Sequence, residues 1–161
     1  MSDHATDGRD RPAAAASSSF PQLPPGDLYA PPKIFEEARS IGPQLRSKQV
    51  QLKEPSAESV GKVHETAKKT GDTVSQADCD AIALALDMGA TLVTDDYASQ
   101  NIASFLGVRF MPLSKPGITK RRIWRLKCPN CGEWLKGATC PICGVRGKRT
   151  VFKQESLPAE A

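Results

Sequence analysis

Four cysteines toward the end of the chain have the spacing of a metal site. They form two pairs, Cys128 with Cys131 and Cys140 with Cys143, and each pair reads Cys-Pro-x-Cys-Gly. The two-residue gap lets both sulfurs reach one ion, and the glycine permits a tight turn in which backbone amides face the thiolates. Four thiolates close a tetrahedral site without room for water, so we expect a structural Zn²⁺. A redox or disulfide role is the alternative, which two matching pairs in a basic module disfavour.

Acidic residues recur at the ends of three expected elements. The pairs are Glu36 and Glu37, Asp78 and Asp80, and Asp95 and Asp96. Clustered carboxylates repel one another unless a divalent cation holds them, and Mg²⁺ or Mn²⁺ held in this way can activate water and stabilise an in-line phosphoryl displacement. Helix capping is the alternative, because Asp96 can cap the helix that follows it and Asp78 lies three residues after Ser75. Three acid pairs exceed what capping needs.

The charge of the chain is unevenly distributed. From Lys115 to Lys153 there are eleven Lys and Arg against one acid, Glu133, which gives that segment a charge of about +10. The net charge of +4 therefore leaves about −6 for the remainder. A basic module attached to an acidic body predicts a polyanionic partner at the basic end.

The elements that must position these residues alternate between helix and strand. We expect helices starting at Pro31–Pro32, running from Ser56 to about Lys69, lying between Ser75 and Gly89, and closing at Gly107, with strands in "KQVQLKEP", "ATLVT" and "VRFMPL". This order predicts a parallel sheet covered by helices. Such sheets bind ligands at the carboxyl ends of their strands, where "ATLVT" meets the last acid pair. The fifth cysteine, Cys79, starts an apolar helix and is expected to be a small core residue.

Composition divides the chain further. We assign a disordered or degenerate segment to residues 1–26, an α/β domain to 27–114, a basic linker to 115–127, a zinc ribbon to 128–153 and a tail to 154–161. The first segment is polar and rich in Ala, Ser and Pro. We find no secretory signal and no apolar run long enough to cross a membrane, and the cysteine spacing is of the metal type. These features predict a cytoplasmic protein with no membrane partner.

Several stretches, in this order, resemble the Nob family of ribosome-maturation endonucleases. They are "LYAPPKIFEEARS", "QLKEP", "AKKTGD", "SQADCDAIALAL" and "TDDYASQN", followed by the four-cysteine ribbon. The likeness runs from about Gly26 to Phe152, and the compact length resembles the archaeal members. It implies a PIN nuclease domain over residues 27–114, cleavage of precursor small-subunit ribosomal RNA at its 3′ end, and the pre-ribosomal particle as partner.

The resemblance also assigns roles to residues. Glu37, eight residues after Tyr29, matches the helix acid of the family. Asp78 matches the acid that opens the buried helix, and Asp96 matches the acid at the strand end. These three would hold the catalytic Mn²⁺ or Mg²⁺, and Asp95 would tune the field or cap the helix. Trp124 would stack on a base or pack between the two domains. The residues expected to bind RNA are Lys120, Arg121, Arg122, Trp124, Arg125, Lys127, Lys148 and Arg149.

One departure from the family concerns its first strand, which ends in Asp and is followed by small residues and Phe. "SSSF" at residues 17–20 matches the second part, but Ala16 stands in place of the Asp and "RPAAA" in place of the strand. We therefore expect the strand and one metal ligand to be missing, through lost activity or an unnatural chain start. The rival hypotheses are a catalytically impaired RNA-binding factor of the pre-ribosome and, more weakly, a toxin-type PIN ribonuclease, which is not expected to carry this ribbon.

Overall fold

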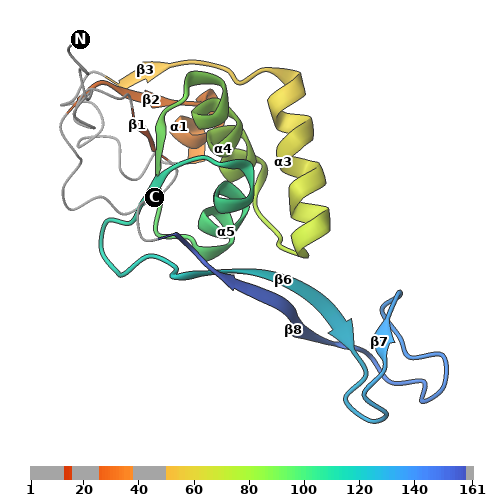
Figure 1. Ribbon diagram of the computed structural model, residues 1–161. Helices are drawn as coiled ribbons and strands as arrows, with labels where there is room; N and C mark the ends of the chain where they lie inside the picture. The colour runs from red at the N-terminus through yellow and green to blue at the C-terminus, as the bar shows by residue number, and fades with distance from the viewer. Residues whose placement is uncertain (1–12, 16–25, 38–49, 159–161) are drawn as a thin grey trace.

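A five-stranded parallel sheet forms the centre of the larger domain (Figure 1). The computed structural model describes residues 13–15, 26–37 and 50–158, without the side chains of 13–15 and 35–37. The strand order is β3-β2-β1-β4-β5. The strands are β1 (Ala13–Ala15), β2 (Leu28–Ala30), β3 (Val50–Leu52), β4 (Thr91–Val93) and β5 (Phe110–Met111). The helices are α1 (Pro32–Glu37), α3 (Ala57–Thr70), α4 (Gln76–Met88) and α5 (Tyr97–Leu106). The expected α/β class is confirmed.

Strand β1 overturns the expectation that the first strand is missing. Ala13–Ala15 pairs with β2 on one side and β4 on the other, so this segment is the central strand of the sheet. Three alanines lack the branched side chains that mark a buried strand, so the sequence pattern did not reveal it. Pairing satisfies the backbone groups on both sides whatever the side chain. The expected disorder is therefore wrong for Ala13–Ala15, while Ala16 lies outside the described residues.

The helix boundaries follow the expected capping residues. The hydroxyl of Ser56 accepts the N–H of Ser59 at the start of α3, and that of Ser75 accepts the N–H of Asp78 at the start of α4. Helices α3 and α4 end at Gly71 and Gly89, both with left-handed backbone angles. Local chemistry thus fixes both helices as predicted.

Helix α4 forms the core of the domain. Its residues Ala81, Ile82, Ala83, Leu84 and Ala85 are all buried, as an apolar run around the whole helix predicts. It packs against the sheet, and α3 covers its outer side (Figure 1). Cys79 is 1% exposed in this core, and burial raises the pKa of its thiol to about 11, which confirms a structural residue.

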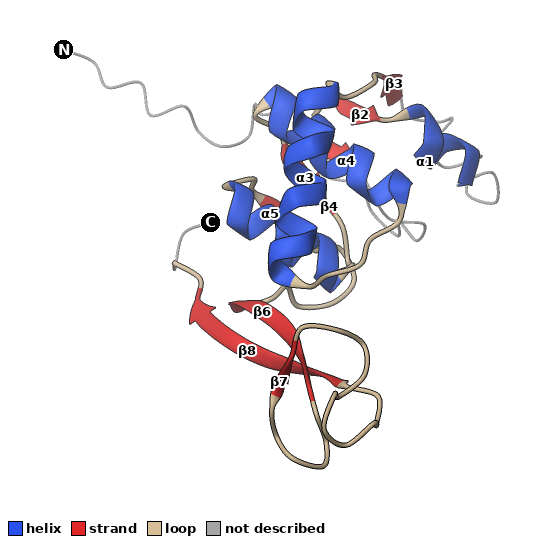
Figure 2. Cartoon of the chain, turned by 90° about the vertical axis from the view of Figure 1, so that its right-hand side faces the viewer, coloured by secondary structure: helices blue, strands red, loops and turns tan. Residues whose placement is uncertain are grey.

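A second, three-stranded antiparallel sheet follows, in the order β7-β6-β8. This sheet and its loops, residues 120–156, are called the ribbon from here on. It consists of β6 (Lys120–Lys127), β7 (Trp134–Leu135) and β8 (Lys148–Ser156). Most of the expected linker is therefore strand, and β8 continues into the expected tail. The long pair β6 and β8 projects from the helical body and carries β7 at its far end (Figures 1 and 2). No helix in the described part of the chain is both long enough and apolar enough to cross a membrane.

Candidate functional site

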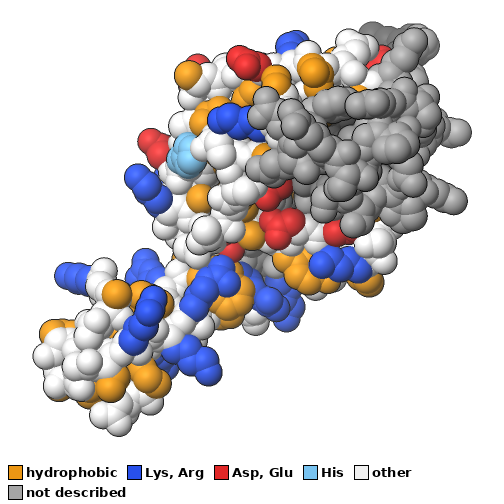
Figure 3. Space-filling view, turned by 180° about the vertical axis from the view of Figure 1, so that it is seen from behind, with side chains coloured by type: hydrophobic (Ala, Val, Ile, Leu, Met, Phe, Trp, Pro, Cys, Tyr) orange, Lys and Arg blue, Asp and Glu red, His pale blue; other side chains and the backbone are white. Residues whose placement is uncertain are grey.

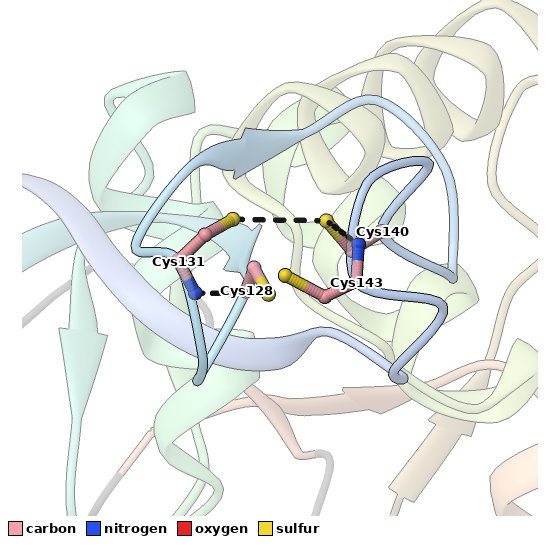
Figure 4. Close-up of side chains that lie close together, drawn as sticks. All are labelled: Cys128, Cys131, Cys140 and Cys143. Carbon is pink, nitrogen blue, oxygen red and sulfur yellow. Dashed lines mark hydrogen bonds between the residues drawn. The ribbon is translucent and has the colours of Figure 1, made fainter.

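The four predicted cysteines converge at the end of the ribbon (Figure 4). Their sulfur atoms all lie within 4.8 Å of one another, and those of Cys131 and Cys140 are 3.7 Å apart. Four sulfurs at about 2.3 Å from one tetrahedral ion stand about 3.8 Å apart, so the cluster fits a zinc ribbon. Among the described side chains, this is the one group of three or more possible ligands that lie this close.

Each cysteine pair sits in the same turn. In the first, the N–H of Gly132 donates to the carbonyl of Cys128, and in the second the N–H of Gly144 donates to the carbonyl of Cys140. Both glycines have positive φ angles, of 78° and 69°. The predicted role of the glycine after each pair is therefore confirmed, because a side chain would strain this backbone.

The electrostatics of the cluster favour a bound cation. A hydrogen bond from the backbone N–H of Cys131 lowers the pKa of the Cys128 thiol to about 6. The backbone N–H of Glu133 favours the thiolate of Cys131, but desolvation and the three neighbouring cysteines together outweigh it and raise the pKa of Cys131 to about 12. One thiolate therefore forms readily and opposes the next, and a metal ion would remove that repulsion.

The acid pair after β4 has two separate local roles. Asp96 is the N-cap of α5, and its Oδ2 accepts hydrogen bonds from the N–H and the hydroxyl of Ser99. Asp95 accepts the N–H groups of Leu113 and Ser114 and the Ser114 hydroxyl, and thereby holds the loop after β5. Of the two roles expected for Asp95, capping the helix is wrong, because Asp96 is the N-cap, and tuning the field stays a prediction.

The acids of α4 lie at the start of that helix. Asp78 accepts a hydrogen bond from the hydroxyl of Ser75 at 3.0 Å, as the capping-box spacing suggested. Asp80 is buried and is held by Gln76 and by Lys33 of α1, whose Nζ is 3.6 Å from its carboxylate. Contacts between α1 and α4 therefore bring the acid-bearing helices together. Glu37 is the last residue of α1, and its side chain lies outside the described set.

Two neighbouring strands, β1 and β4, end at the same edge of the sheet. Ala15 pairs with Val93, so β1 and β4 end side by side in a parallel sheet. The residues that follow them in the chain are Ala16 and Thr94. Figure 3 shows acidic side chains gathered in the middle of one face of the molecule, with Lys and Arg side chains over the base of the ribbon.

The predicted RNA-binding cations divide into paired and unpaired groups. Arg149 binds the buried carboxylate of Asp72 at 2.9 Å and the carbonyl of Gly71, so it joins the ribbon to the body. Arg121 pairs with Glu155 at 2.7 Å. Within the described residues, no carboxylate pairs with the other five, which are Lys120, Arg122, Arg125, Lys127 and Lys148.

One face of the ribbon carries aromatic side chains that sequence reasoning missed. Phe152 and Trp134 are both 40% exposed, and their rings meet edge to face with centroids 5.1 Å apart. Arg125 lies 3.7 Å from the ring centroid of Phe152, and Lys127 lies 5.2 Å from that of Trp134. Exposed rings flanked by cations are typical of surfaces that bind single-stranded nucleic acid.

A β-bulge explains why Phe152 joins this face. Ile123 pairs with Lys153 and Trp124 pairs with Val151, so Phe152 is an extra residue without a partner. A bulge of this kind changes the direction of a side chain and is common near functional sites. The bulge depends on the pairing with β6, so no local pattern in the sequence reveals it.

Comparison with known proteins completes the description. Residues 25–88 match the family model described as the PIN domain of ribonuclease. Endoribonuclease Nob1 of Methanocaldococcus jannaschii is 34% identical over 141 residues, which cover 83% of this chain and 72% of the relative. The chain belongs to the Nob1 family of PIN-domain endoribonucleases.

Two further relatives are a second Nob1 protein and a ribonuclease of another name. Endoribonuclease Nob1 of Pyrococcus abyssi is 35% identical over 140 residues, 80% of this chain and 86% of the relative. Ribonuclease VapC1 of Thermoplasma acidophilum is 37% identical over 145 residues, 82% of this chain and 72% of the relative. The alignment with VapC1 covers 82% of the chain, whereas residues 1–114 make up less than three quarters of it. The alignment therefore extends beyond the PIN domain. The likeness to the Nob1 family and to VapC1 thus includes part of the ribbon module.

Proposed function

We propose that this endoribonuclease matures the 3′ end of precursor small-subunit ribosomal RNA in the pre-ribosomal particle. The observation that carries the proposal is the likeness to proteins named endoribonuclease Nob1 over four fifths of the chain. The architecture supports it, because a PIN fold and a four-cysteine ribbon occur together in the expected order. The domain bounds given above and a cytoplasmic location belong to the same proposal.

We assign the catalytic cation site to Glu37, Asp78 and Asp96. Glu37 is assigned on the family resemblance, and the helix that carries it, α1, contacts α4 through Lys33 and Asp80 among others. Asp78 and Asp96 each lie at a helix N-terminus, where the helix dipole stabilises a carboxylate. Both hydrogen bonds that Ser99 makes to Asp96 go to Oδ2, which leaves Oδ1 for a ligand.

A divalent ion in this site, Mg²⁺ or Mn²⁺, would supply an activated water and polarise the scissile phosphate. The residues of the chain would hold the reacting groups in place. Asp96 is fixed by its cap, so its carboxylate keeps one orientation before RNA arrives. Asp95 holds the loop after β5 and thereby shapes the approach to the sheet edge.

The ribbon would bind a structural Zn²⁺ and position the RNA. The four-sulfur geometry supports zinc, and so small a module needs a metal to fold. Arg125 and Lys127 would bind phosphates while Phe152 and Trp134 stack on bases. Trp124 lies near Gly71, and its ring is 4.1 Å from Arg149, which binds Asp72, so Trp124 lies at the junction with the body.

A second candidate is a catalytically impaired RNA-binding factor, and Ala16 is the observation that favours it. This residue follows the central strand in the position where the family carries Asp. Loss of one carboxylate weakens a divalent site, because charge count sets its affinity. The two candidates predict the same RNA binding but different rates of cleavage.

The test is cleavage of a precursor ribosomal RNA fragment in the presence of Mn²⁺ or Mg²⁺, with binding measured in parallel. We expect a metal-dependent cut at the 3′ end of the small-subunit sequence, lost in Asp96→Asn and kept in Glu65→Gln, which neutralises an exposed acid of α3. RNA binding without any cut would favour the impaired factor. Indiscriminate cutting of unrelated RNAs would favour a toxin-type ribonuclease.

A further inference from the structure

A cleft of about 490 Å³ lies where the ribbon leaves the PIN domain. One side is formed by α5 and the other by the start of β6, and the loop before β6 closes one end. The residues that line it include Asp72, Tyr97, Asn101, Lys120, Arg122, Trp124 and Arg149. The volume is within the range of sites for small ligands, about 300–1,000 Å³.

The floor of the cleft is rigid. Asn101 donates to the carbonyl of Arg122 and accepts the N–H of the same residue, both at 2.8 Å, so its amide pairs with β6 as a neighbouring strand would. Its second donor hydrogen goes to the buried carboxylate of Asp72, which also binds Arg149. These bonds make the cleft pre-formed, and they occupy both amide N–H groups of Asn101.

The mouth of the cleft is positively charged. Asp72 is neutralised by Arg149, and its side chain is only 2% exposed. Lys120 and Arg122 are exposed, and within the described residues neither has a carboxylate partner. Two unpaired cations at one opening favour a phosphate group.

Aromatic rings line the same opening. Tyr97 is 48% exposed, and its hydroxyl donates to the carbonyl of Pro116 at 3.3 Å, which fixes the ring. Trp124 is half-buried, and Arg149 and Arg122 lie 4.1 Å and 5.8 Å from its ring centroid. Rings beside cations are the groups on which unstacked bases rest in single-stranded RNA complexes.

We propose that this cleft binds one nucleotide, with its phosphate on Lys120 and Arg122 and its base against Tyr97 and Trp124. Tyr97 directly follows Asp96, so the nucleotide would lie next to the scissile phosphate. That placement rests on the proposed function, whereas nucleotide binding itself does not. All four bases should bind with similar affinity, because the amide N–H groups of Asn101 and the carboxylate of Asp72 are already engaged.

The experiment uses tryptophan fluorescence. The chain has two tryptophans, so Trp134→Phe leaves Trp124 in the cleft as the single reporter. Titration with each nucleoside 5′-monophosphate should quench it saturably at millimolar concentration. In this background Tyr97→Phe should bind normally because it keeps the ring, and Tyr97→Ala should bind about tenfold more weakly.

Charge provides the second arm. The double variant Lys120→Ala, Arg122→Ala should weaken binding at least tenfold, whereas Lys136→Ala, Arg146→Ala removes the same charge from exposed ribbon loops outside the cleft and should leave it unchanged. Absence of saturable quenching, or equal affinity in both double variants, would overturn the proposal. Nucleotide binding without RNA cleavage would contradict the proposed function but not the nucleotide site. RNA cleavage by a protein whose cleft binds no nucleotide would contradict the nucleotide site but not the proposed function.

Discussion

Asp96, at the edge of the sheet, stabilises the fold and is, under the proposed function, also a metal ligand. Asp96 caps α5 through one carboxylate oxygen and leaves the other for a ligand. The capping alternative and the metal alternative for this residue are therefore compatible. The loss of unfolding free energy on replacing such a residue depends on whether the new side chain can still cap the helix. The two roles can therefore be separated by the choice of variant.

Asp96→Asn and Asp96→Ala should differ in stability but not in activity. Asparagine caps a helix about as well as aspartate, whereas alanine costs about 0.5–2 kcal/mol of unfolding free energy. Both variants should lose metal-dependent cleavage, because neither supplies a charged ligand. Urea denaturation and an RNA cleavage assay measure the two effects, and retained cleavage in Asp96→Asn would exclude the carboxylate from the metal site.

Asp95 should make stability depend on acid pH. The Ser114 hydroxyl and the Leu113 N–H lower the pKa of its carboxyl group below the ordinary value of about 3.9. A depressed folded-state pKa contributes stability above the unfolded value, and this contribution is lost as the pH falls through the folded-state pKa. Denaturation midpoints compared between pH 6 and pH 3 should therefore fall less in Asp95→Ala than in the native chain. An identical pH profile in both proteins would contradict this role.

At the scale of elements, the features that could be predicted from the sequence are those that depend on residues close together in the chain. Ser75 and Asp78 form a cap three residues apart, and Gly71 ends α3, so both were predictable. The role of Asp95 depends on Ser114, which lies nineteen residues later in the chain, after α5 and β5, so no local pattern contains it. The alanine strand β1 was missed for a related reason, because its neighbours in the sheet, not its own side chains, define it.

The presence of β1 changes what can be expected of Ala16. Ala16→Asp adds a carboxylate directly after the central strand in the sequence, and that strand ends beside β4. We expect Mn²⁺ affinity to rise by about tenfold and cleavage to accelerate, since charge count sets the affinity of such sites. Ala16→Asn is the matched control. Isothermal titration with Mn²⁺ measures the effect, and equal affinities in both variants would place position 16 outside the site.

Gly71 is a contact point between α3 and the ribbon. Its φ angle is +74°, and a Cβ there would stand 2.5 Å from the carbonyl oxygen of Trp124. Gly71→Ala should therefore cost about 1–3 kcal/mol of unfolding free energy and displace β6. Gly89→Ala, at a left-handed helix end with open space around it, is the control for backbone strain alone. Chemical denaturation and Trp124 fluorescence measure stability and displacement, and equal losses in the two variants would argue against the contact.

At the scale of the whole molecule, the ribbon has two differently supported ends. Its base is bound to the PIN domain through Asn101 and through the Asp72–Arg149 ion pair. Its far end contains the cysteine cluster and almost no apolar core, and Ile142 there is 76% exposed. The two ends should therefore lose structure under different conditions.

Metal removal should unfold only the far end. Chelation, or Cys131→Ser, should release about one equivalent of zinc and abolish the hydrogen-exchange protection of residues 128–147. Protection of Lys120–Trp124 and of α4 should persist, because the contacts of Asn101 do not involve the metal. Elemental analysis and hydrogen exchange by mass spectrometry test this, and simultaneous loss of protection in α4 would show that the two domains unfold together.

The paired strands β6 and β8 also give the molecule a fixed length. Eight residues of β6 at about 3.3 Å each separate the base of the ribbon from the cysteine turns by about 25 Å. Under the proposed function, an RNA bound along the ribbon would reach the sheet edge at a fixed distance from the part that the ribbon holds. The protein would then select the bond to cut by this distance, as a ruler does, and would need no contact that recognises a base at the cut itself.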